Sequence, residues 1–96
     1  MEKNRFRLVN CMADDAITVR LRRDGKRCIG ILDFPTFQAS TGRIIRSDFL
    51  PPFPAAVALL KATQIQPLTP YREIVVRLED GVEWMPFWGD LVNELK

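Results

Sequence analysis

An Asp-Gly dipeptide at residues 24–25 stands between two stretches that have the residue pattern of β-strands. Before it, Ile17, Val19 and Leu21 alternate with polar residues; after it, residues 27–34 read RCIGILDF. Alternation with a period of two places apolar side chains on one face of a strand, and Asp-Gly between two strands favours a tight turn. The sequence therefore predicts an antiparallel hairpin in the first third of the chain.

The register of this hairpin decides which side chains are buried. A three-residue loop at 23–25 places Val19 opposite Ile29 and keeps the apolar side chains of both strands on the core face. A two-residue turn at Asp24-Gly25 sets Val19 opposite Gly30 and mixes the faces. Because a slip of one residue sends every side chain of a strand to the other face, burial favours the three-residue loop.

The middle of the chain predicts one helix. Residues 55–63 are mostly alanine, valine and leucine, and two prolines precede them at positions 52 and 54. Proline is tolerated in the first helical turn, where the amide protons lack partners in any case. Since a helix that is apolar around most of its circumference belongs in the core, we expect an apolar helix near 53–64 that lies on the sheet.

Residues 71–80 fit two structures. The spacing of their apolar residues suits a helix that stops at Gly81, and it also suits a strand followed by a turn at Asp80-Gly81. Because β-branched residues fill positions 74–76, we choose the strand and a second hairpin, in which 72–79 pairs with 82–85. Pro86 then opens a short C-terminal helix, which must dock on the sheet because it is too short to be stable alone.

Together these elements predict an α+β fold, with a single antiparallel sheet of about four to six strands carrying both helices on it. A length of 96 residues, 47% of them hydrophobic and 27% charged, suits one globular domain spanning 1–96. The N-terminus has no apolar core of a signal peptide, and no uncharged run is long enough to cross a bilayer. We therefore expect a soluble, cytoplasmic protein that binds no membrane.

Several kinds of chemistry are disfavoured by the residues present. The chain has no histidine and only two cysteines, Cys11 and Cys28, which we expect to be buried thiols. A zinc site needs four Cys or His ligands, and the commonest nucleophile pairs need histidine as the base. The five glycines do not have the spacing of a nucleotide-binding loop. We expect no metal, no cofactor and no enzymatic activity, and a carboxylate-based enzyme ranks last among the functions considered.

Basic side chains crowd positions 20–27, at the predicted hairpin tip. Such a patch can contact a nucleic-acid backbone, but exposed strands also carry Lys and Arg to prevent edge-to-edge pairing. The hairpin has no aromatic side chains on which bases could stack, and this counts against nucleic-acid binding. The candidate anion or nucleic-acid contacts are Arg5, Arg7, Arg20, Arg22, Arg23, Lys26 and Arg27.

The stretch EWMPFWGDL at 83–91 contains both tryptophans of the chain. Large apolar side chains here serve either the core or an interface, because Trp, Phe and Met are enriched at the centres of interfaces. The sequence leaves both roles open for the tryptophans. The candidate interface consists of Trp84, Met85, Phe87, Trp88 and Leu91.

These observations favour a small, non-enzymatic binding or interaction module that forms a homodimer through its Trp-rich C-terminal segment, since two-fold dimers are the commonest oligomers. A different protein partner would use the same surface. The alternative is a nucleic-acid-binding accessory protein that uses the basic hairpin. Nothing in the sequence identifies the ligand or the biological process.

Overall fold

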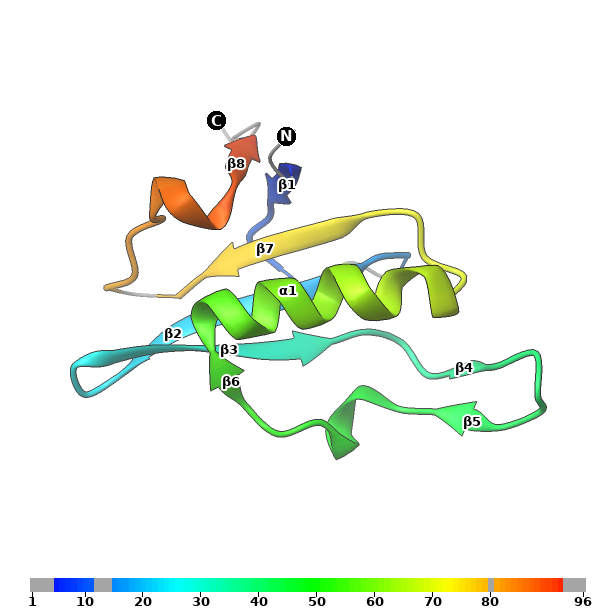
Figure 1. Cartoon of the computed structure of the whole chain (residues 1–96). Helices are drawn as coiled ribbons and strands as arrows, with labels where there is room; N and C mark the ends of the chain where they lie inside the picture. The colour runs from blue at the N-terminus through cyan, green and yellow to red at the C-terminus, as the bar shows by residue number, and fades with distance from the viewer. Residues whose placement is uncertain (1–4, 12–14, 80, 93–96) are drawn as a thin grey trace.

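The computed structural model describes residues 5–11, 15–79 and 81–92. A six-stranded sheet in the order β6-β3-β2-β7-β1-β8 carries the helix α1 (Ala55–Ile65) across one face (Figure 1). In chain order, the strands of this sheet are β1 (Arg5–Leu8), β2 (Ile17–Asp24), β3 (Arg27–Asp33), β6 (Phe53–Pro54), β7 (Ile74–Leu78) and β8 (Asp90–Val92). The smaller elements are β4 (Phe37–Gln38) paired with β5 (Ile44–Ile45), and the 3-10 turns η1 (Ser47–Phe49), η2 (Gln66–Leu68) and η3 (Pro86–Trp88).

The large sheet is mixed. β3 is antiparallel to both β2 and β6, whereas β2, β7, β1 and β8 run parallel to one another. An α+β fold with a helix on a sheet is thus confirmed, but the prediction of a single antiparallel sheet is wrong. Parallel neighbours are joined by long connections, so no turn in the sequence marks their pairing.

The predicted hairpin is present as β2 and β3, with a register that differs from the one we favoured. Asp24 pairs with Arg27, which leaves Gly25 and Lys26 as a two-residue turn. Gly25 has a φ of +65° and Lys26 has no positive φ, as in a type II′ turn, which requires glycine at its first central position. The turn therefore lies one residue further along the chain than the Asp24-Gly25 turn considered above, and neither of the two registers considered is the observed one.

The close approach of α1 explains this register. A Cβ atom at Gly30 would lie only 2.4 Å from the Cβ of Ala58, so glycine is the residue that fits beneath the helix. Gly30 therefore faces α1, and Ile29 and Ile31 on either side of it point to the opposite face. The expectation that Ile29 lies opposite Val19 on the core face is wrong, because Val19 pairs with Leu32.

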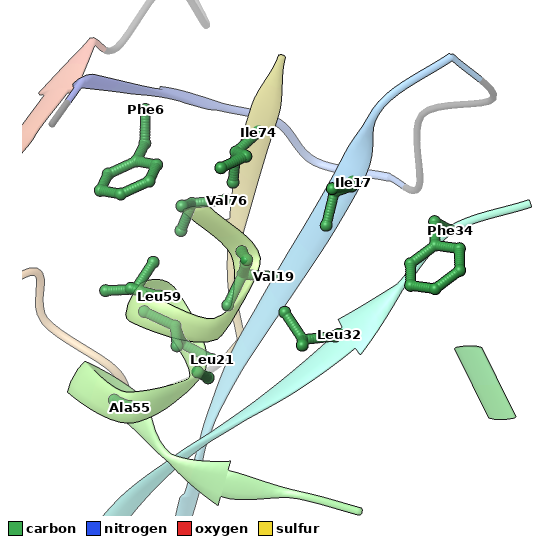
Figure 2. Close-up of a cluster of buried hydrophobic side chains, with 12 residues drawn as sticks. Phe6, Ile17, Val19, Leu21, Leu32, Phe34, Ala55, Leu59, Ile74 and Val76 are labelled. Carbon is green, nitrogen blue, oxygen red and sulfur yellow. The ribbon is translucent and has the colours of Figure 1, made fainter. Parts of the chain in front are cut away.

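The core fills the space between the sheet and α1 (Figure 2). Val19 and Leu21 of β2 are fully buried there, and Phe6 reaches the same cluster from β1. Leu59 and Ala62 face the sheet from the helix. The apolar helix predicted near 53–64 is confirmed within one or two residues.

β7 lies in the interior of the sheet, between β2 and β1. Ile74, Val75 and Val76 are all buried, as expected of a parallel strand that is covered on both faces. The choice of a strand within 71–80 is confirmed, but the second hairpin is wrong, because no strand forms at 82–85. Gly81 has a φ of +85° and begins a loop instead, while Asp80 lies outside the described residues.

The C-terminal segment ends in a strand, so the predicted short helix is wrong over the residues described. Pro86 opens only the 3-10 turn η3, after which β8 pairs in parallel with β1. β1 offers unpaired backbone groups at the sheet edge, and a short helix is not stable alone, so strand pairing prevails. Residues 93–96 of the predicted helix lie outside the described residues.

Among the described residues, no helix has the length and apolar character needed to span a bilayer.

Candidate binding surfaces

The two tryptophans hold the C-terminal segment onto the sheet. The Trp84 ring meets the ring of Phe6 edge-on, with 5.8 Å between the ring centroids, and Trp88 stands edge-on to Trp84 at 5.2 Å. The Trp84 indole nitrogen donates a hydrogen bond of 3.0 Å to the carbonyl of Gly89. Both rings are half-buried against the core cluster, so their main packing is within the chain.

The other candidate interface residues divide between the core and the surface. Leu91 is half-buried and packs on the core cluster from β8. Met85 and Phe87 point outward, with 45% and 77% of their surface exposed. The C-terminal segment, residues 84–92, is thus a layer with Trp84, Trp88 and Leu91 packed on its inner side and two large apolar side chains on its outer side.

The same segment forms one edge of the sheet. β8 is the last strand in the order and pairs with β1 on one side. Figure 1 shows β8 beside β1 and directly after η3, which carries Phe87. The outer backbone groups of an edge strand are available for pairing with another strand. Among the described residues no strand pairs with the outer edge of β8, and the exposed Phe87 lies just before this strand in the chain.

Two of the seven predicted basic contacts are neutralised within the fold. Arg7 forms an ion pair with Glu73 at 2.6 Å, and Arg20 forms one with Glu79 at 3.0 Å. Arg20 also lies 4.0 Å from Asp33 on β3. These pairs lie on the face of the sheet opposite α1. Arg7 and Arg20 therefore belong to a layer of ion pairs on that face.

The remaining basic candidates separate into two places. Arg22, Arg23, Lys26 and Arg27 are all exposed at the end of the β2–β3 hairpin, which reaches past the helix (Figure 1). Within residues 5–11, 15–79 and 81–92, none of these four takes part in an ion pair. Arg5 is also exposed, but it lies on β1 and lines other pockets.

The hairpin tip and the C-terminal segment meet at one surface pocket of about 390 Å³. The side chain of Arg23 lies over the backbone of Gly81, with its Cδ atom 3.3 Å from the position of a Cβ there. No local pattern in the sequence predicts this contact, because the two segments are far apart along the chain and no turn joins them. The pocket is lined by Arg23, Lys26, Arg27, Cys28, Gly81, Val82, Glu83, Met85 and Trp88.

The two cysteines are free and differ in exposure. Cys28 is half-buried in this pocket, and burial raises the pKa of its thiol while the charge of Arg23 lowers it by less. Cys11 is exposed, so the expectation that both thiols are buried is wrong for this one. Among the described residues, no group of three or more His, Cys, Asp or Glu side chains could hold a metal ion.

The carboxylates near the surface pockets lie apart from one another. Glu73, Glu79 and Asp33 all contact arginines. Four pockets on the described surface are each lined by at most one carboxylate. The largest of these four, an apolar groove of about 650 Å³ between the β4–β5 hairpin and the end of α1, has none.

Comparison with known proteins finds no relative: the chain matches no family model, no curated protein and no solved structure. The geometry of the C-terminal segment and of the β2–β3 hairpin tip is therefore what points to a function.

Proposed function

We propose that the chain is a small, non-enzymatic binding module that forms a homodimer through its C-terminal segment. One observation carries the proposal: among the described residues no strand pairs with the outer edge of β8, and Phe87, which is 77% exposed, lies just before β8 on a segment anchored by two tryptophans. A large apolar side chain held outward beside an unpaired strand edge is a typical contact for a second chain.

Burial of Phe87 supplies the main driving force for this association. Covering a phenylalanine side chain that is otherwise exposed stabilises an assembly by about 1.5–3 kcal/mol. Because Trp84 and Trp88 already fix the segment on the sheet, little conformational entropy is lost when a partner binds. Met85, 45% exposed on the same segment, adds to the apolar area.

A second copy of the chain suits this edge. In a two-fold dimer the same patch meets itself, so β8 would pair antiparallel with β8 of the partner, and Phe87 of each copy would pack across the axis. The strand is only three residues long, so backbone pairing supplements the side-chain burial.

The mass in solution, measured by light scattering, tests the proposal. We expect twice the chain mass of 11.0 kDa for the wild type at tens of micromolar, and a monomer for Phe87→Asp. The matched control is Leu68→Asp, since Leu68 is 75% exposed at the apolar groove, away from β8. A monomeric wild type, or equal dissociation by both substitutions, would contradict the proposal.

The alternative function, a nucleic-acid-binding accessory protein, is favoured by a different observation. The four exposed cations at the hairpin tip form a local excess of positive charge, and such patches bind phosphates in a salt-dependent way. The contact set proposed for this role is reduced to Arg22, Arg23, Lys26 and Arg27, since Arg7 and Arg20 already pair with carboxylates and Arg5 lies apart from the tip on β1.

A further inference from the structure

We infer that the pocket between the hairpin tip and the C-terminal segment binds a nucleotide unit, with its phosphate on the basic side chains and its base against Trp88. This inference rests on the alternative function above and does not require self-association. The ligand is a phosphate-bearing heteroaromatic group, either a free nucleotide or one unit of a single-stranded nucleic acid.

The charges lining the pocket favour a phosphate. Arg23, Lys26 and Arg27 bring three positive charges, and Glu83 brings one negative charge. The guanidinium fork of arginine matches phosphate oxygens, and lysine adds a mobile point charge. All three cations are exposed, so their desolvation costs little when the phosphate binds.

The apolar part of the lining favours a base. The sequence of the hairpin has no aromatic residue at its tip, but the fold brings Trp88 and Met85 to the same pocket from the C-terminal segment. Trp88 is half-buried and held edge-on by the rings of Trp84 and Phe87, so its orientation is fixed before a ligand arrives. Stacking of a base on an aromatic side chain contributes about 1–3 kcal/mol and tolerates any base.

The volume of the pocket also suits a nucleotide unit. A volume of about 390 Å³ lies within the range of about 300–1,000 Å³ that is usual for small-molecule sites. By contrast, the larger groove at the other end of the molecule is mostly apolar and has two arginines, Arg43 and Arg46, in its lining. The pocket at the tip, unlike this groove, brings several cations and an indole together.

Two double substitutions, each of which removes two positive charges, test the phosphate contact. Binding of a fluorescent single-stranded oligonucleotide is measured by anisotropy at several salt concentrations. We expect Arg23→Gln with Lys26→Gln to weaken binding and to reduce the salt slope by about 0.7, the contribution of one phosphate contact on a single strand. The control, Arg43→Gln with Arg46→Gln, removes the same charge at the opposite end of the molecule (Figure 1) and leaves the slope unchanged.

An abasic oligonucleotide with the same number of phosphates tests the base contact. We expect the base-containing strand to bind about five- to 150-fold more tightly, which corresponds to about 1–3 kcal/mol, and to change the tryptophan fluorescence. A mononucleotide that binds as tightly as the strand identifies a free-nucleotide site, and binding of the strand alone identifies a nucleic-acid site.

The inference is overturned if neither ligand binds, if both charge pairs reduce binding equally, or if the abasic strand binds as tightly as the normal one. Measurements on the wild type above and below the concentration at which it dimerises separate this inference from self-association. Retained binding where the chain is monomeric places the site within one copy, whereas binding lost together with the dimer overturns a site built by one chain.

Discussion

The β2–β3 hairpin and the C-terminal segment are held in place in opposite ways. The two strands of the hairpin are adjacent in the sequence, pair with each other through a two-residue turn and bury Leu21 fully. The C-terminal segment has no partner next to it, and β8 pairs with β1 at the other end of the chain. The hairpin is a local structure, whereas the C-terminal segment depends on the finished sheet.

This difference determines where new contacts can form. The two strands of the hairpin pair with each other and with β7 and β6 on their outer sides, and the hairpin offers charged side chains at its tip. The C-terminal segment leaves the outer edge of β8 open and offers apolar side chains. The last strand of the described sheet is therefore the one suited to gain a partner on its outer side.

The largest effect on stability is expected when one leucine in each region is truncated to alanine. We expect Leu21→Ala to reduce the free energy of unfolding by about 2–5 kcal/mol, because it leaves a cavity under the helix. Leu91→Ala should cost less than about 2 kcal/mol, because Leu91 is half-buried at the edge. Urea denaturation monitored by tryptophan fluorescence measures both, and equal losses would break the distinction between the regions.

A smaller effect is expected at the two ion pairs beneath the sheet. Glu79→Gln removes the partner of Arg20 in the hairpin, and Glu73→Gln removes the partner of Arg7 on β1. Each pair is partly exposed, so each change should cost at most about 1 kcal/mol and less in high salt. Because β1 carries β8, only Glu73→Gln should also weaken association of the C-terminal segment, as measured by the dimer dissociation constant. If Glu79→Gln weakened the dimer as much as Glu73→Gln, this would argue against a specific link between β1 and the association of the C-terminal segment.

Where the deciding contacts are local, the sequence predicted the structure. Alternation of Ile17, Val19 and Leu21 located β2, and the glycine after Asp24 located the turn. The apolar run from residue 55 located α1. In each case the side chains that set the structure lie within a few residues of one another, so their spacing is visible in the sequence.

The parts that were missed depend on distant contacts. The hairpin register follows from the space between Gly30 and Ala58 of the helix, which no local pattern reports. Asp80-Gly81 has the residues of a hairpin turn, but β7 finds parallel partners on both sides and pairs with no strand among the described residues that follow it. Pro86 begins only a 3-10 turn instead of the predicted helix, because the free edge of β1 converts the following residues into a strand.

In the candidate sites, too, local features were predicted and features that depend on distant contacts were not. The residue types at the hairpin tip and at 83–91 were identified from composition, but their roles depend on packing. The sequence could not distinguish the tryptophans, which pack inward, from Phe87, which points outward. Nor could it predict that Trp88 and Arg23 line one pocket, because that requires the strand order.

Amide hydrogen exchange of residues 90–92 tests the central claim, that the open edge of β8 is the contact between two copies. The measurement compares the wild type with Phe87→Asp and with the control Leu68→Asp at the same protein concentration. We predict that protection of these amides falls in Phe87→Asp and is retained in Leu68→Asp, because only the former exposes the edge to water. Unchanged protection in Phe87→Asp would contradict the claim.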